Sequence, residues 1–231
     1  TKEAAHYGAV HGTTVIAEIQ TGGKGRLGRK FHSPLGMGVY MSVIIRPKLS
    51  LDSSLLVTSC AAVAVAQAIE RVAPELECKI KWVNDIYIND KKVCGILTEA
   101  AVDVEQGGLE YAVIGMGVNV QNSSFPEELA NIATSIKMEV HHNVSRNLLA
   151  AEILNCLEEQ LDAIDSGEFM KEYIRRSNVI GRRITVTQGE DMFTADCYGI
   201  DEKGRLLVRC ENGKEKAIGS GTIRFADGEG N

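Results

Sequence analysis

Between residues 78 and 120 the sequence predicts four β-strands in close succession. Apolar and β-branched residues cluster near 78–83, 86–88, 93–100 and 110–120. Asn89-Asp90, between the second and third clusters, is typical of a tight hairpin turn. Parallel neighbours would need crossover connections of about a dozen residues or more, which the short connections here do not provide. The sheet should therefore be mixed and largely antiparallel, and a simple βαβ repeat does not fit.

Further strands and two helical regions flank this central stretch. Residues 13–19 and 38–45 read as strands, and small and aliphatic residues recur at helical spacing from 51 to 72. A second helical region runs over 145–178, with Ser166-Gly167 separating two helices. Its apolar face should carry Leu148, Leu149, Ile153, Leu157, Leu161 and Ile164. The expected fold is α+β, a sheet flanked by helices.

After Gly181 the pattern changes to short strands separated by turns. Turn signals occur at Gln188-Gly189, at 202–204 and at Asn212-Gly213. About fifty residues of this kind suit a small β-barrel. We therefore expect two domains, 1–180 and 181–231.

Composition excludes several classes of protein. The net charge of -6 makes the chain as a whole a poor match for nucleic acid, and no apolar run approaches the ~20 residues of a membrane span. The six cysteines form no Cys-x-x-Cys pair, which argues against a structural zinc site and favours reduced thiols in a cytoplasmic protein. Because the first residue is Thr1 rather than Met, we expect that some upstream residues are absent.

A basic, glycine-rich loop from Gln20 to Pro34 is the most informative segment. It combines four cationic side chains with four glycines directly after a predicted strand. Exposed backbone N–H groups and positive charge together suit a phosphate or carboxylate ligand. The spacing Gly23-x-Gly25-x-x-Gly28 matches a dinucleotide fingerprint, but no long helix follows it. A solvated surface loop is the alternative, but the cluster of cations without nearby acidic residues argues against it.

Two further segments are candidates for ligand binding. Asn84-Asp85 could be only a turn, but Trp82, the single tryptophan, lies beside it, and Lys92 leads into a strand in which Gly95 permits close ligand approach. The third segment, 114–120, has two alternating glycines inside a strand. These indicate either a bulge or a planar ligand lying flat against the backbone.

These three segments, in this order, resemble the biotin-protein ligase family. That family has a Gly-Arg-Gly-Arg-type loop, a Lys-Trp-Pro-Asn-Asp stretch, a lysine before a Gly-Ile-Leu strand and a Gly-x-Gly-x-Asn strand. The resemblance runs from about Gly12 to the C-terminus, where 199–201 and 204–206 look like the family's small barrel. It implies a catalytic domain like that of class II aminoacyl-tRNA synthetases, followed by an SH3-like barrel, in a monofunctional member without a visible DNA-binding domain.

The resemblance also implies a reaction. In the presence of Mg²⁺, biotin and ATP would form biotinyl-5'-AMP. Biotin would then pass to a lysine of a biotin carboxyl carrier protein. Lys92 and Arg26 would neutralise the anionic reactants, and Asp85 would accept a proton from the acceptor lysine. No residue is assigned as a metal ligand, and a homodimer is possible. The implied binding residues are Gln20, Gly23, Lys24, Gly25, Arg26, Phe31, Trp82, Asn84, Lys92, Gly95, Gly115, Gly117 and Asn119.

The chain departs from the family pattern at several positions. Lys24 stands where arginine is commoner, Val83 replaces the usual proline, and Phe31 occupies a position where some members have tryptophan. The Asp-Ser-Thr-Asn segment that lines the family's biotin pocket is not visible. Three alternatives stay open: a lipoate or octanoate transferase, a biotin-sensing repressor with an upstream DNA-binding domain, and a non-catalytic nucleotide-binding module.

Overall fold

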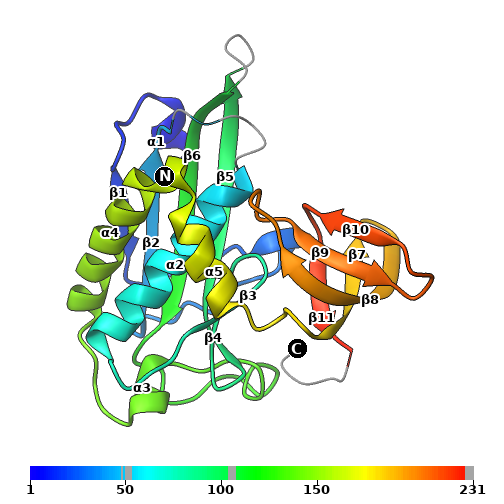
Figure 1. Ribbon diagram of the computed structural model, residues 1–231. Coiled ribbons are helices and arrows are strands. Elements are labelled where there is room, and N and C mark those ends of the chain that lie inside the picture. The colour runs from blue at the N-terminus through cyan, green and yellow to red at the C-terminus, as the bar shows by residue number, and fades with distance from the viewer. Residues whose placement is uncertain (48, 50–53, 104–107, 227–231) are drawn as a thin grey trace.

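The main layer of the protein is a six-stranded sheet in the order β1-β2-β6-β5-β4-β3 (Figure 1). The computed structural model describes residues 1–47, 49, 54–103 and 108–226. The strands are β1 (Thr14–Ala17), β2 (Gly38–Ile45), β3 (Lys79–Lys81), β4 (Asp85–Ile88), β5 (Lys91–Asp103) and β6 (Gly108–Asn119). Every pairing between them is antiparallel, which confirms the largely antiparallel sheet predicted from the short connections.

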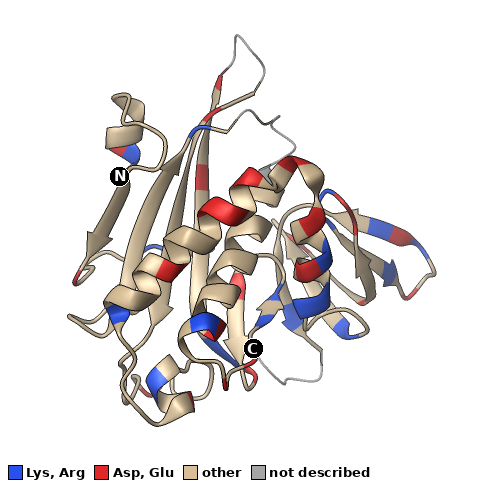
Figure 2. Ribbon diagram, turned by 60° about the vertical axis from the view of Figure 1, so that its left-hand side comes forward, with Lys and Arg blue, Asp and Glu red and all other residues tan. Residues whose placement is uncertain are grey.

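Three helices cover one face of this sheet. They are α2 (Ser54–Val72), α4 (Arg146–Asp162) and α5 (Glu168–Arg176). Acidic residues mark the outer helices, whereas basic residues gather towards the C-terminal part of the molecule (Figure 2). The shorter helices are α1 (Lys2–His6), η1 (Arg26–Gly28), α3 (Ile136–Val140) and η3 (Ile164–Ser166).

Helix α2 is the core of the helical layer. Small side chains such as Ala61, Ala64 and Ala68 are fully buried, so the sheet and α4 can both approach it closely. Its segment Leu55–Val72 is long and apolar enough to cross a membrane, but 67% of it is buried within the protein. That burial is expected of a core helix and explains the apolar sequence without a membrane.

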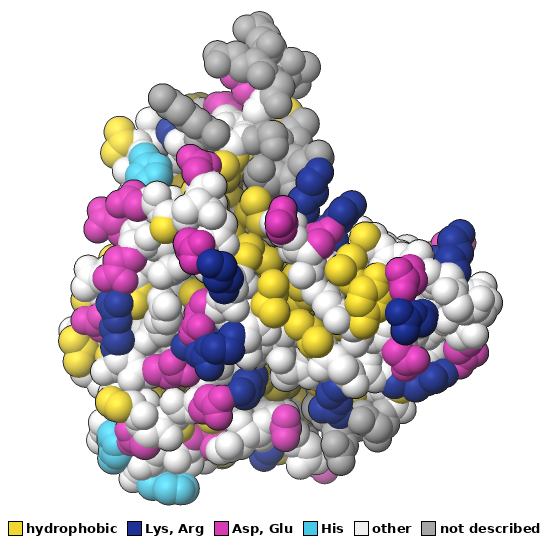
Figure 3. Space-filling model, in the orientation of Figure 1, with side chains coloured by type: hydrophobic (Ala, Val, Ile, Leu, Met, Phe, Trp, Pro, Cys, Tyr) yellow, Lys and Arg dark blue, Asp and Glu magenta, His cyan; other side chains and the backbone are white. Residues whose placement is uncertain are grey.

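The C-terminal residues form a second sheet of five antiparallel strands in the order β10-β9-β8-β7-β11. These strands are β7 (Arg183–Gln188), β8 (Asp191–Ile200), β9 (Leu206–Cys210), β10 (Glu215–Ile218) and β11 (Thr222–Phe225). Hydrophobic side chains gather where this sheet meets the rest of the molecule (Figure 3). We call this five-stranded unit the C-terminal sheet.

The strands and turns predicted from sequence are confirmed, with shifts of a few residues at their ends. Asn89 and Asp90 both have positive φ angles, 47° and 62°, as a tight hairpin turn requires. The start of the predicted first helix, 51–53, lies outside the described residues. One prediction is wrong: Leu148 is 52% exposed. Adjacent helical positions differ by about 100°, so when Leu149 faces the core Leu148 turns towards solvent.

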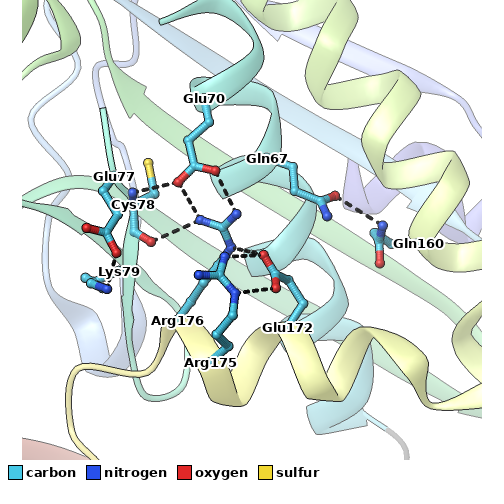
Figure 4. Close-up of polar contacts among 9 residues, drawn as sticks. All are labelled: Gln67, Glu70, Glu77, Cys78, Lys79, Gln160, Glu172, Arg175 and Arg176. Carbon is cyan, nitrogen blue, oxygen red and sulfur yellow. Dashed lines mark hydrogen bonds and ion pairs between the residues drawn. The ribbon is translucent and has the colours of Figure 1, made fainter. Parts of the chain in front are cut away.

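A buried arginine joins the helical layer to the edge of the main sheet (Figure 4). Arg176, only 4% exposed, donates to both carboxylate oxygens of Glu70 at 2.6 and 2.7 Å and to the Cys78 carbonyl at 3.1 Å. Its Nε donates to Glu172 at 2.8 Å. The hydrogen bond from Arg175 helps to lower the pKa of Glu172 to about 2. Burial alone would raise the pKa of Glu70, but the hydrogen bonds from Arg176 lower it overall.

Replacing the buried arginine should destabilise the fold far more than replacing its exposed neighbour. We expect Arg176→Ala to lower the free energy of unfolding by about 3–5 kcal/mol, because it leaves Glu70 in a partly buried site without its partner. Arg175 is exposed and also binds Glu172, so Arg175→Ala is the matched control and should cost about 1 kcal/mol or less. Urea unfolding measures both values, and equal losses would contradict this account.

The same ion pairs should make part of the free energy of unfolding depend on pH. Both glutamates have pKa values below the ordinary 4.5, so their contribution is present above that pH and is lost as the pH falls towards 2. The difference in unfolding free energy between the parent protein and Arg176→Ala should therefore shrink from about pH 5 to about pH 3. A difference that stays constant over this range would show that the ion pairs are not its source.

Candidate functional site

A cavity of about 700 Å³ opens between the basic loop, the main sheet and the C-terminal sheet. Its walls include Gln20, Gly22, Lys24, Gly25, Arg26, Arg29, Lys30 and Phe31 from the loop, Lys81, Trp82, Asn84, Asp85, Tyr87, Lys92 and Gly95 from β3–β5, Gly115, Gly117 and Asn119 from β6, and Thr222, Ile223 and Arg224 from β11. Three segments that are far apart in sequence thus surround one space.

Every residue that the sequence analysis assigned to the site lines this cavity except Gly23. A side chain at Gly23 would meet the Phe31 carbonyl oxygen at 2.7 Å and the Ser33 hydroxyl at 2.9 Å. Gly23 therefore serves the internal packing of the loop, whose ends are held together by a bridge between Lys24 and Lys30. The other predicted residues are brought together as expected, although this placement alone does not assign their roles.

Positive charge predominates in the cavity although the protein as a whole is negative. Among the described residues, seven lysine and arginine side chains line it, against the two carboxylates Asp85 and Glu99. Fields from like charges add in a partly enclosed site, so the cavity favours anionic ligands. The local basic character expected from the loop is present.

Lys92 and Asp85 form an ion pair on the wall, with Nζ and Oδ1 separated by 2.8 Å. Gly95 makes room for it, because a side chain there would meet the Lys92 ammonium at 3.1 Å. The backbone of Lys92 is also bound on both sides, donating to the Ile132 carbonyl and accepting from the Thr134 N–H, each at 2.9 Å. Lys92 is thus held in place while its charged end faces the cavity.

Arg26 connects three parts of the structure. Its guanidinium donates to Asn84 Oδ1 at 3.1 Å and to the Gly221 carbonyl in the C-terminal sheet region at 2.9 Å. Burial lowers the pKa of this guanidinium. Arg26 therefore holds the loop against both sheets.

Gly117 of β6 makes room for an aromatic ring of the protein itself. The Phe31 ring lies where a side chain at Gly117 would be, with its nearest carbon 2.6 Å from that position. It also lies 3.5 Å from the position a side chain at Gly95 would take. The sequence analysis left open a bulge or a planar ligand at these glycines, and in this structure the ring over Gly117 is the protein's own Phe31.

Asn119, on the same strand, presents an unused acceptor. Its side-chain nitrogen donates to the Thr134 carbonyl at 3.1 Å, whereas its buried Oδ1 has no hydrogen-bond partner among the described residues. Buried polar atoms in native proteins are nearly always paired. A ligand N–H group is one partner that would satisfy it.

Sequence reasoning missed several cationic residues of the site. Lys81 is 6% exposed, and burial lowers its pKa to about 8, with Lys92 and Arg29 adding to the effect. Arg224 reaches the cavity from β11. Lys81 could have been noticed from its place beside Trp82, but nothing local to Arg224 connects it with a loop two hundred residues earlier.

Fold and cavity together define an α+β protein with a cationic cavity between its main sheet, a basic loop and the C-terminal sheet. Comparison with known proteins specifies the class further. Residues 4–119 match the model of the biotin/lipoate A/B protein ligase family, and residues 179–225 match that of the biotin protein ligase C-terminal domain. The chain belongs to the biotin/lipoate A/B protein ligase family, and the resemblance found in the sequence is confirmed.

Curated relatives and solved structures agree with this assignment. The bifunctional ligase/repressor BirA of Bacillus subtilis is 38% identical over 219 residues, which cover 93% of this chain and 66% of the relative. The chain thus spans just under two thirds of that protein. The biotin–[acetyl-CoA-carboxylase] ligase of Mycobacterium tuberculosis is 29% identical, with 95% of this chain and 81% of that protein covered. The structure of the Aquifex aeolicus biotin protein ligase in complex with biotin and ATP superposes with a TM-score of 0.83, at 28% identity, covering 97% of this chain and 94% of that one.

The contact between Phe31 and Gly117 can be tested by a double-mutant cycle. Gly117→Ala should displace the Phe31 ring and lower the free energy of unfolding by about 1–2 kcal/mol, since the ring loses its buried contact. In a Phe31→Ala background the same substitution should cost close to nothing. Thermal unfolding of the four proteins gives the coupling, and additive effects would place the ring elsewhere in solution.

Proposed function

We propose that this chain is an ATP-dependent biotin-protein ligase. It would join biotin and ATP to form biotinyl-5'-AMP and pyrophosphate, and then transfer biotin to a lysine of a biotin carboxyl carrier protein. The observation that carries this proposal is the single cavity in which Arg26, Lys92 and Asp85 meet. The solved relative from Aquifex aeolicus, which has the same fold over nearly the whole chain, is described in complex with biotin and ATP.

The first half-reaction brings two anions together. The biotin carboxylate must approach the α-phosphate of ATP, and the cations Lys24, Arg26 and Lys92 would reduce the repulsion between them. Lys92 would bind the carboxylate after exchanging its contact with Asp85. Among the described residues no three His, Cys, Asp or Glu side chains are grouped to hold a metal, so Mg²⁺ would be held chiefly by the ATP phosphates.

The second half-reaction needs a neutral amine. Asp85 would accept the proton of the acceptor lysine, or orient that lysine, as it attacks the mixed anhydride. The protein itself needs no covalent nucleophile for this step. Five of the six cysteines are buried, and burial raises the pKa of Cys60 to about 12, so they are unsuited to that task.

The remaining proposals concern organisation. We place a domain boundary near residue 180, which the two sheets and the two separate family matches support. The catalytic part would be related to class II aminoacyl-tRNA synthetases, and the C-terminal sheet would form an SH3-like barrel. Use of ATP and six unpaired cysteines fit a cytoplasmic location. A homodimer is compatible with the proposal but is not required by the site.

Biotin is favoured over lipoate or octanoate as the substrate. The family model that matches the first half covers both biotin and lipoate ligases, but the model that matches residues 179–225 is described for biotin protein ligases. Incubation with ATP, Mg²⁺ and either biotin or lipoate, followed by mass analysis of the bound small molecule, separates the two. Recovery of biotinyl-5'-AMP supports the proposal, and recovery of a lipoyl adenylate alone would contradict it.

A lysine pair on β5 gives a matched test of the mechanism. Lys92→Met should slow biotin-dependent exchange of pyrophosphate into ATP by about 100-fold or more, because the carboxylate loses its charged partner in the transition state. Lys91→Met changes the neighbouring lysine, which does not line the cavity and reaches the Ala130 carbonyl at 3.5 Å, and should leave exchange within about twofold of the parent rate. Equal effects of the two substitutions would remove Lys92 from the reaction.

A further inference from the structure

The segment Ile80–Asn84 contacts the C-terminal part of the chain directly through its first four residues and, at Asn84, through Arg26. At its start, the Ile80 carbonyl accepts a hydrogen bond from the Asn178 N–H at 3.1 Å, and Ile80 forms a parallel bridge with Ser177. The Val83 carbonyl accepts from the buried Tyr173 hydroxyl of α5 at 3.0 Å. The linker that leads to the C-terminal sheet is therefore bound directly to the edge strand.

The side chains between these two carbonyls bind the C-terminal sheet itself. The Trp82 indole N–H donates to the Gly204 carbonyl at 2.9 Å, in a buried contact. Lys81 Nζ lies 4.6 Å from the centre of the Phe225 ring, and the guanidinium of Arg182 lies 4.2 Å from the same ring. Phe225 on β11 is thus anchored by a cation from the main sheet as well as by one from its own side of the molecule.

The last residue of the segment extends the connection to the basic loop. Asn84 accepts from Arg26, which also donates to the Gly221 carbonyl. Gly221 directly precedes Thr222–Arg224, the part of the C-terminal sheet that lines the cavity. The wall, the loop and the edge strand are therefore joined through one short segment.

We propose that Ile80–Asn84 is a docking segment that fixes the C-terminal sheet over the cavity. Within it Trp82 acts as a positioning residue, because its single N–H donor is used by the Gly204 carbonyl. Phe225 has the matching role on the C-terminal sheet. This inference refines the proposed function, since it concerns the wall of the same cavity, but the docking itself does not depend on which reaction takes place there.

The position of the C-terminal sheet relative to the main sheet depends on the contacts between them, because parts of one chain that share few contacts move relative to each other. The hydrophobic side chains between the C-terminal sheet and the rest of the molecule (Figure 3) attract each other without a preferred direction, so they alone do not fix the relative position of the two parts. The indole hydrogen bond and the ring contact are directional, so they fix the position of β11. Loss of either should open the wall without unfolding either sheet.

The single tryptophan makes this testable by fluorescence. Trp82 is 4% exposed, so acrylamide should quench it poorly in the parent protein. In Phe225→Leu we expect at least about a twofold rise in the quenching constant and a red-shifted emission, because local opening exposes the indole to solvent. The KM for a substrate of the pyrophosphate exchange should rise about fivefold or more with kcat nearly unchanged, because the wall contributes binding rather than chemistry.

Phe193→Leu is the matched control. Phe193 also lies in the C-terminal sheet beside a lysine, Lys216, whose Nζ is 4.0 Å from its ring centre, but this lysine belongs to β10 of the same sheet and not to the docking segment. It should match the parent in quenching and in KM, and its thermal midpoint should resemble that of Phe225→Leu. Should Phe225→Leu fail to fold, Lys81→Met removes the cation from the same contact and is read by the same quenching.

Unchanged quenching and unchanged KM in a folded Phe225→Leu would overturn the docking proposal. Equal changes in Phe193→Leu would overturn it too, because they would reveal general loosening of the sheet. A rise in quenching confined to Phe225→Leu, in a protein that shows no biotin-dependent exchange at all, would support the docking segment while removing the proposed reaction.

Discussion

The direct pairing of Gly95 with Gly117 across β5 and β6 is the constraint on which the site depends. Two residues without side chains face each other in the middle of a sheet, leaving a shallow floor where larger residues would fill the space. The Lys92 ammonium occupies one side of that floor and the Phe31 ring the other. The register of this hairpin therefore decides where charge and apolar surface meet, and a shift by one residue would remove both.

Each principal cation above this floor already has a partner within the protein. Lys92 binds Asp85, and Arg26 binds a side-chain amide and a backbone carbonyl. A buried cation without partners would be costly, so these contacts stabilise both charges and hold them in place. In the proposed reaction Lys92 would exchange Asp85 for the incoming carboxylate, whereas Arg26 would keep its partners.

Much of this arrangement could be predicted from the sequence because its signals are local. Asn89-Asp90 indicated a hairpin, and the glycines of β6 indicated either a bulge or a planar ligand. The position of the Phe31 ring over Gly117 was not foreseen, because it depends on the path of a loop that few local contacts constrain. Arg224 was missed for a related reason: its place in the cavity follows from how the two sheets dock. The prediction for Leu148 was wrong because this residue lies about 100° around α4 from Leu149, on the solvent side of the buried face.

In the proposed function Arg26 would be both an anchor and a ligand contact. A guanidinium has five N–H donors in a fixed fork, and the contacts with Asn84 and Gly221 use two of them. Three donors are left, so under the proposed function a phosphate would bind without breaking the link to the C-terminal sheet. A lysine could not replace it, since its three donors radiate from one point and do not span acceptors on different segments. The loop therefore needs arginine at this position for geometry as much as for charge.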